Sequence, residues 1–163
     1  MTAAVLYPGT FDPITHGHED LIRRAARLFG GVVIGVAASP SKSPLLPLDE
    51  RIRLVRTVLE DVDGVVDVTG FEGLTVEFAR SRQLRAIVRG VRSGSDLDLE
   101  AQLAAMNARL DGTIETVLLP ATPELVFVSA TLVREIATLG GDVSPFVHPV
   151  VGASLRAALA RRE

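Results

Sequence analysis

The sequence predicts an α/β protein with a single doubly wound, Rossmann-like domain, in which a mainly parallel five-stranded sheet carries helices on both faces. Short apolar runs alternate with segments of helical periodicity along the whole chain. The run at 32–38 is continuously apolar and rich in valine, as expected of a strand buried on both faces. The 163 residues contain no repeat or linker, so one domain spanning 1–163 is expected.

The expected elements follow one another in regular order. The expected strands are 3–6, 32–38, 65–68, 86–88 and 115–119. The first helix presents one apolar face, and later helices are expected at 48–60, 74–82, 96–110, 129–139 and 149–161. The helix at 96–110 has an apolar stripe that we expect to face the core, made of Leu99, Leu103, Met106 and Leu110. Gly112 is expected to end this helix in a left-handed conformation, and His148 is interpreted as structural, beside Pro149 at the last helix start.

Composition excludes several classes of function. The chain has no cysteine, which excludes disulfides, thiolate zinc sites and cysteine nucleophiles. The formal net charge of −3 offers no general attraction to nucleic acid. The start of the sequence lacks the pattern of a signal peptide, and no apolar run approaches the ~20 residues of a membrane helix. We therefore expect a cytoplasmic protein without nucleic-acid or membrane partners.

Residues 7–18, Tyr-Pro-Gly-Thr-Phe-Asp-Pro-Ile-Thr-His-Gly-His, form the first candidate site. An apolar run precedes this segment and a helical pattern follows it, which is the layout that places a phosphate at a helix N-terminus. Gly9 lets the backbone approach a ligand, and Thr10 offers a hydroxyl. His16 and His18 do not share a helix face, which argues against a paired metal site. Near a helix N-terminus a histidine tends to stay neutral and can donate one hydrogen bond to a phosphoryl oxygen.

Two more candidate loops follow the second and fourth expected strands, at the edge where doubly wound sheets bind ligands. Lys42 lies in a proline-stiffened loop and offers a mobile positive charge for a phosphate; the alternative is an ordinary solvated lysine. Arg89 and Arg92 flank Gly90, and guanidinium groups bind phosphates in a bidentate manner. The alternative is that these arginines pair with nearby acids, namely Asp96, Asp98 or Glu100. Both interpretations hold if the acids order the arginines until a polyphosphate arrives.

Two further features have a functional and a structural interpretation. Glu100 and Asn107 are seven residues apart and share a face of one helix, where a carboxylate can hold ribose hydroxyls or remain an ordinary surface group. Ser129 ends an apolar segment and begins a helix, so it is either a simple N-cap or part of a site for the outer phosphates of a nucleotide.

Taken together, these motifs resemble the phosphopantetheine adenylyltransferase family of the nucleotidyltransferase superfamily, which has an (H/T)xGH signature. The resemblance covers nearly the whole chain. It rests on residues 7–18, Ala38-Ser39-Pro40-Ser41-Lys42, Arg89-Gly90-Val91-Arg92, Met106-Asn107 and Val128-Ser129-Ala130-Thr131-Leu132-Val133-Arg134-Glu135.

The resemblance implies transfer of AMP from ATP to 4′-phosphopantetheine by direct in-line attack, giving dephospho-coenzyme A and pyrophosphate. It also implies magnesium brought with ATP, no metal-ligating residue in the chain, a homohexamer, and inhibition by coenzyme A. The implied catalytic residues are His18, Lys42, Thr10 and Arg92. The implied substrate-binding residues are Thr10, Lys42, Leu74, Arg89 and Asn107. The implied ATP-binding residues are Thr10, Phe11, His18, Gly90, Val91, Arg92, Glu100, Leu125, Val126, Phe127, Val128, Ser129, Ala130 and Thr131.

The sequence departs from the family pattern in two places. An aromatic pair usual at the start of the long helix is replaced within Leu97-Asp98-Leu99, and Ala130 interrupts a serine-rich run. Three alternatives therefore stay open: an adenylyltransferase for nicotinate or nicotinamide mononucleotide, a nucleotide-binding regulatory module without catalysis, and a generic α/β domain. Tyr7-Pro8-Gly9 and the loop around Lys42 argue against the first alternative.

Overall fold

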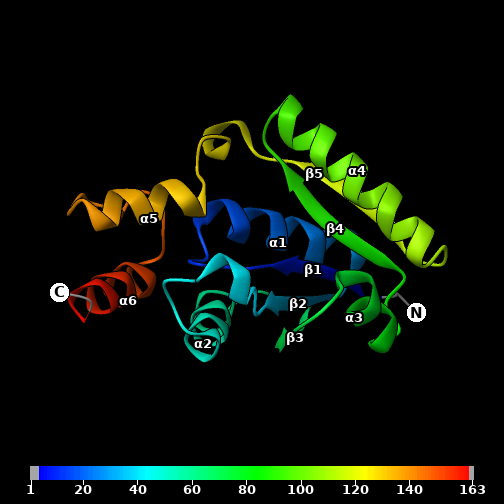
Figure 1. The fold of residues 1–163 in the computed structure, drawn as a ribbon, viewed down its shortest axis with the longest axis horizontal. Coiled ribbons are helices and arrows are strands. Elements are labelled where there is room, and N and C mark those ends of the chain that lie inside the picture. The colour runs from blue at the N-terminus through cyan, green and yellow to red at the C-terminus, as the bar shows by residue number, and fades with distance from the viewer. Residues whose placement is uncertain (1–3, 162–163) are drawn as a thin grey trace.

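The computed structural model describes residues 4–161 as one five-stranded sheet with helices on both faces (Figure 1). Residue 3, the expected start of the first strand, lies outside the described residues. The strands are β1 (Val5–Gly9), β2 (Val32–Ala37), β3 (Val65–Phe71), β4 (Ala86–Val91) and β5 (Glu115–Pro120). The helices are α1 (His16–Phe29), α2 (Leu48–Val58), α3 (Thr75–Ser81), α4 (Gly94–Leu110), α5 (Ala130–Thr138) and α6 (Pro149–Ala160).

The strand order is β3-β2-β1-β4-β5, and every neighbouring pair is parallel, which confirms the predicted fold class. The chain winds outward from β1 to β3 and then crosses back to β4, so the direction of winding reverses between β1 and β4. Strand β1 pairs with β2 over five residues, whereas its register with β4 is recorded only at Leu6 and Ile87. Such a reversal point is where doubly wound sheets bind ligands, beyond the carboxyl ends of the strands.

Two apolar cores pack against the two faces of the sheet. Helices α1 and α2 bury Ile22 and Val55 against the β2 residue Ile34, and residues of α5 and α6 extend the same core. On the opposite face, α3 buries Val76 and Ala79 in a smaller core. In the first core, the apolar faces predicted from helical periodicity meet the sheet as expected. In the described residues, no helix combines the length and apolar character needed to cross a bilayer.

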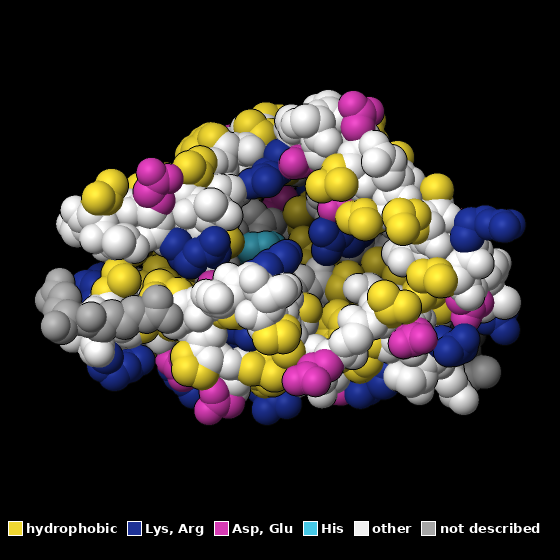
Figure 2. All heavy atoms as spheres, in the orientation of Figure 1, with side chains coloured by type: hydrophobic (Ala, Val, Ile, Leu, Met, Phe, Trp, Pro, Cys, Tyr) yellow, Lys and Arg dark blue, Asp and Glu magenta, His cyan; other side chains and the backbone are white. Residues whose placement is uncertain are grey.

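Helix α4 contradicts the prediction that its apolar stripe faces the core. Exposed side chains run along it, at Leu97, Leu99, Leu103, Met106 and Leu110, and Figure 2 shows hydrophobic side chains along its course. Glu100 is instead the one buried residue of this helix, at 7% exposure. The apolar stripe is present but faces outward. The polar side of α4 faces the sheet, where Glu100 binds Arg89.

Two local expectations are also corrected. Gly112 does not end α4 in a left-handed conformation; the helix ends at Leu110, and its C-cap residue Asp111 is extended with φ −151°. Strand β4 is longer than predicted, so Arg89, Gly90 and Val91 belong to the strand and only Arg92 follows it. His148 has the structural role expected, because its Nδ1 accepts from the Val150 N–H at 3.3 Å and caps α6.

Candidate active site

The carboxyl ends of β1, β2 and β4 bring the predicted loops to one edge of the sheet. Thr10 follows β1, the loop with Lys42 follows β2, and Arg92 follows β4. Because these three strands are neighbours in the sheet, the expected common edge is confirmed. Figure 2 shows this face hollowed near its centre, with a histidine side chain in the hollow and Lys or Arg side chains around it.

His18 is held by a reciprocal cap at the start of α1. The Thr15 N–H donates to His18 Nδ1 at 3.1 Å, and the His18 N–H donates to Thr15 Oγ1 at 3.4 Å. Since a backbone N–H is always a donor, Nδ1 must be the acceptor, and the hydrogen of the neutral ring lies on Nε2. The Phe11 ring packs edge-on against the imidazole with centroids 5.1 Å apart. His18 therefore has a fixed tautomer, with one N–H left to donate.

The charge state of His18 agrees with the sequence prediction. Burial of the imidazole, with the positive charges of Arg89 and Arg92, lowers the pKa of His18 from 6.5 to about 4. The ring is therefore neutral near pH 7, as expected at a helix N-terminus. It can stabilise negative charge as a hydrogen-bond donor without changing its protonation state.

The turn between β1 and α1 has a compact internal structure. Phe11 is buried to 2% exposure with φ 50°, and a Cβ at Gly9 would stand 3.0 Å from its ring. Gly9 is thus required for the packing of Phe11 as well as for any approach of the backbone to a ligand. The hydroxyl of Thr10 lies 3.3 Å from that of Ser39, which joins this turn to the loop that follows β2.

Lys42 lies at the end of a short 3₁₀ turn, Pro40–Lys42, and is exposed. It is the only lysine in the chain. No hydrogen bond or ion pair of its side chain is recorded within residues 4–161, so its ammonium group is available to a ligand. Its position on the predicted edge is confirmed, and its contact with substrate stays a prediction.

Arg89 and Glu100 bind each other through two hydrogen bonds. Arg89 Nε and Nη2 donate to the two oxygens of Glu100 at 2.9 and 2.7 Å, and Nη1 donates to the Pro8 carbonyl at 3.0 Å. This guanidinium thereby bridges β4 and β1 where the two strands separate. The predicted alternative, in which acids pair with the arginines, is therefore realised.

Arg92 makes the second such pair, and it also reaches the segment before α5. Its Nε and backbone N–H both donate to Asp96 Oδ2 at 3.1 Å, and Nη1 donates to the Val128 carbonyl at 3.2 Å. Between the two arginines, a Cβ on Gly90 would lie 2.3 Å from a methyl of Leu21. The packing of α1 against β4 is thus one firm reason for a glycine there.

The segment after β5 is anchored to α1. The Thr122 hydroxyl donates to Asp20 at 2.6 Å, and Arg24 donates to the Pro120 carbonyl at 2.8 Å. Ser129 accepts from the Leu132 N–H at 3.1 Å, so its role as an N-cap is confirmed. Seven of the residues predicted to contact ATP lie at 125–131; Val128 is buried and the other six, Leu125, Val126, Phe127, Ser129, Ala130 and Thr131, are partly or fully exposed.

Leu74 and Asn107 lie on the other side of the sheet from α1. Leu74 is the residue before α3 and is 49% exposed, while Asn107 is half-buried on α4, on the same side of the helix as Glu100. Their predicted contact with substrate stays a prediction, as does that of Val91, whose carbonyl accepts from the Ala121 N–H.

Sequence reasoning missed three charged residues that shape this site. Asp12 accepts from the N–H groups of Leu45 and Leu46, both at 2.9 Å. Arg134 donates to the Asp12 carbonyl and thus joins α5 to the turn after β1. Arg51, on α2, is 2% exposed and donates to backbone carbonyls beside the site. The only available signal was that Asp12 and Arg134 fall inside recognised motifs; Arg51 resembles its exposed neighbours.

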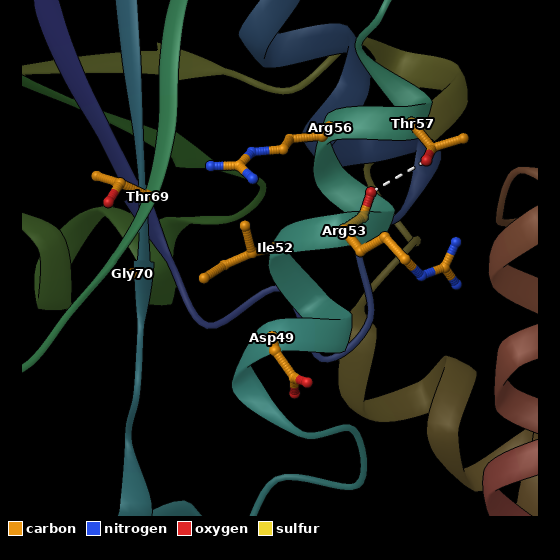
Figure 3. Close-up of a pocket in the computed structure, with 7 residues that line it drawn as sticks. All are labelled: Asp49, Ile52, Arg53, Arg56, Thr57, Thr69 and Gly70. Carbon is orange, nitrogen blue, oxygen red and sulfur yellow. Dashed lines mark hydrogen bonds between the residues drawn. The ribbon is translucent and has the colours of Figure 1, made fainter.

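A separate surface cavity of about 380 Å³ lies between α2 and the edge strand β3 (Figure 3). Arg56 extends from α2 toward β3, where it donates to the Val68 carbonyl at 2.7 Å. None of the predicted site residues is among those that line it: Asp49, Ile52, Arg53, Arg56, Thr57, Thr69 and Gly70. This cavity is therefore distinct from the candidate active site.

Comparison of the sequence with known proteins places the chain in a family. Residues 6–136, a range that includes every predicted site residue, match the cytidylyltransferase-like family. A curated protein from Nitrosomonas eutropha named phosphopantetheine adenylyltransferase is 55% identical over 152 residues, which cover 93% of this chain and 92% of that protein.

Two solved structures resemble the chain at lower identity. A Vibrio parahaemolyticus protein, provisionally assigned as a nicotinate-nucleotide adenylyltransferase, has a TM-score of 0.71 at 19% identity, covering 100% of this chain and 98% of its own. The nicotinic acid mononucleotide adenylyltransferase of Plasmodium falciparum has a TM-score of 0.69 at 15% identity, covering 94% of each chain. At these identities the two likenesses establish the fold alone.

Proposed function

Because the chain belongs to the phosphopantetheine adenylyltransferases, within the cytidylyltransferase-like family, we propose that it transfers AMP from ATP to 4′-phosphopantetheine. The products are dephospho-coenzyme A and pyrophosphate, and the reaction is a step of coenzyme A biosynthesis. The observation that carries the proposal is the neutral His18 ring, whose Nδ1 is occupied by Thr15 and whose Nε2–H remains free to donate. A fixed donor of this kind suits a reaction in which negative charge develops on phosphoryl oxygens.

The proposed mechanism is direct in-line displacement. An oxygen of the acceptor phosphate attacks the α-phosphorus of ATP, and the bond from this phosphorus to the bridging oxygen breaks as pyrophosphate leaves. The attacking phosphate is already an anion, so no general base is needed. His18 and Lys42 stabilise the charge of the transition state, Thr10 positions the acceptor, and Arg92 holds the departing pyrophosphate. Catalysis by positioning and electrostatics is typical of phosphoryl-transfer enzymes.

The ion pairs of Arg89 and Arg92 supply a starting arrangement for this site. Arg89 is held by Glu100 and Arg92 by Asp96, so both guanidinium groups already lie at the candidate active site. Anionic substrates then compete with these carboxylates for the arginines. When Arg89 turns to the acceptor phosphate, Glu100 becomes free to accept hydrogen bonds from the ribose of ATP.

Magnesium is proposed to arrive bound to the phosphates of ATP. Within residues 4–161, no group of three or more His, Asp or Glu side chains is arranged to hold a metal ion. Coenzyme A is proposed as an inhibitor because it carries the groups of the product. A cytoplasmic location is proposed because the chain belongs to a family of biosynthetic enzymes.

The exposed side of α4 supports the proposed homohexamer. A row of large apolar side chains on one helix is costly in water and is the kind of surface through which proteins associate. We expect Leu103→Glu with Met106→Glu to lower the mass measured by light scattering, because both side chains are exposed in the single chain, at 42% and 64%. A double variant that keeps the mass of the wild type would count against α4 as the contact surface.

The acceptor is tested by measuring pyrophosphate release from ATP and magnesium with either 4′-phosphopantetheine or nicotinamide mononucleotide. We expect release only with 4′-phosphopantetheine. Release only with the mononucleotide would retain AMP transfer and overturn the proposed acceptor. No release with either compound, from folded protein that binds ATP, would favour a regulatory module without catalysis.

A further inference from the structure

Arg51 is a buried charge that the proposed mechanism does not use. It lies on α2 with 2% exposure and is the largest of the fully buried side chains in the described part of the chain. Its guanidinium donates to four backbone carbonyls, at distances of 2.7 to 3.0 Å: Thr10, Ala37, Ala38 and Leu46. A buried guanidinium with every bond directed to backbone oxygens fixes the course of the chain around it.

These carbonyls belong to the two segments that form the candidate active site. Thr10 is in the turn that leads to His18, whereas Ala37 and Ala38 stand directly before the loop with Lys42 and Leu46 stands after it. Arg51 therefore holds both ends of the Lys42 loop and binds them to the other segment. Asp12 adds a second attachment, because its carboxylate accepts from the N–H groups of residues 45 and 46.

The loop itself needs such support. Ser39 and Ser43, on either side of the 3₁₀ turn, have φ angles of 47° and 44°, a left-handed conformation that is unfavourable for residues other than glycine. Inside the loop, Lys42 N–H bonds to the Ser39 carbonyl and Ser43 N–H to the Pro40 carbonyl. Backbone in a sparsely populated conformation persists only where its surroundings hold it.

We propose that Arg51, together with Asp12, is a positioning residue that fixes the Lys42 loop against the turn carrying Thr10 and His18. It acts on AMP transfer through Lys42 without touching either substrate. This inference rests on the proposed role of Lys42 in the reaction. Lysine cannot replace Arg51, because one ammonium group cannot reach four carbonyls spread around a planar fork.

The test is a double-mutant comparison of Arg51→Lys and Lys42→Ala, with kcat for pyrophosphate release as the measure. Each single variant is expected to lower kcat at least tenfold, and the double variant is expected to match Lys42→Ala within about twofold. An effect in the double variant equal to the product of the two single effects would overturn the inference, because Arg51 would then act independently of Lys42. The matched control is Arg53→Lys, an exposed arginine of the same helix that binds only Glu50, and its kcat should equal that of the wild type.

Amide hydrogen exchange provides a measure that does not depend on activity. In Arg51→Lys, or in Asp12→Asn if that variant folds better, the amides of residues 42, 43, 45 and 46 should exchange at least tenfold faster while those of β1 and β2 keep their protection. Unchanged exchange of the loop would overturn the inference. If Lys42→Ala retains wild-type turnover, the proposed role of Lys42 fails, and the exchange result alone then decides whether Arg51 fixes the loop.

Discussion

His18 has two separable functions, and two substitutions distinguish them. The Nδ1 atom accepts from the Thr15 N–H, whereas Nε2–H is proposed to donate to the transition state. His18→Asn places an amide oxygen near the position of Nδ1 and removes the distant donor. His18→Leu has a shape close to that of the asparagine variant but carries neither the acceptor nor the donor. The first variant should therefore keep the fold and lose activity, whereas the second should lose activity and also part of its stability.

The magnitudes follow from the contacts. Losing one preorganised donor to a phosphoryl transition state costs about 3–4 kcal/mol, so kcat of His18→Asn should fall by roughly 10²–10³. Losing the cap acceptor costs about 1 kcal/mol, so the Tm of His18→Leu should fall by about 2–4 °C for a chain of this size. His16 serves as a control, because its ring is 34% exposed and pairs only with Glu19 at 3.3 Å.

The assay combines single-turnover formation of dephospho-coenzyme A with thermal unfolding of the same preparations. His16→Gln should change neither quantity appreciably. The reasoning about Nε2 would be refuted if His18→Asn retained more than a third of the wild-type kcat. The reasoning about the cap would be refuted if His18→Leu unfolded at the same temperature as His18→Asn.

Three more predictions concern charge and packing. The pKa of His18 is about 4 in the folded protein against 6.5 for the free side chain, so the unfolded state binds more protons between these two pH values. The contribution of His18 to the free energy of unfolding should therefore be fully present above pH 6.5 and decrease toward pH 4. An NMR titration of the ring should give a midpoint below about pH 5. Glu100→Ala should lower the free energy of unfolding, measured by urea titration, by about 2 kcal/mol. This loss is smaller than that expected for a fully buried ion pair, because the side chain of Arg89 is 34% exposed. Gly90→Ala should cost about 1–3 kcal/mol in the same titration, because the new Cβ would meet Leu21 at 2.3 Å.

Matched substitutions control the last two experiments. Asp98→Ala removes an exposed carboxylate from the same helix as Glu100, and it should leave the unfolding free energy unchanged within about 0.5 kcal/mol. Gly94→Ala adds a Cβ that meets no atom within 4 Å. Equal losses in a variant and its control would contradict the assigned contacts, and a His18 midpoint near 6.5 would contradict the burial of its ring.

The local features of the site could be predicted from sequence because they depend on residues close together in the chain. Thr15 and His18 are three residues apart, so the start of a helix brings them into contact whatever surrounds it. The neutral state of His18 was expected from the same position, but burial of the ring and the charges of Arg89 and Arg92, which are tertiary effects, produce it in the structure. The continuous apolar run of β2 likewise predicts a strand covered on both faces, and the structure buries five of its six residues.

Other features depend on which elements become neighbours. Arg51, Arg53 and Arg56 occur on one short helix and look alike in sequence, yet only Arg51 is buried, because it alone faces the carbonyls at the ends of β1 and β2. The pairing of Arg89 with Glu100, rather than with another nearby acid, is decided by the packing of α4 against β4.

The sequence by itself determined the alternation of strands and helices, the parallel sheet and the N-cap role of Ser129, since each of these is governed by propensity and periodicity over a few residues. Only the tertiary structure decided which strands became neighbours and that the apolar stripe of α4 faces outward. Periodicity shows that a helix has an apolar side but not what covers it. Which surface meets the sheet depends on contacts between residues far apart in the chain, such as the one between Arg89 and Pro8.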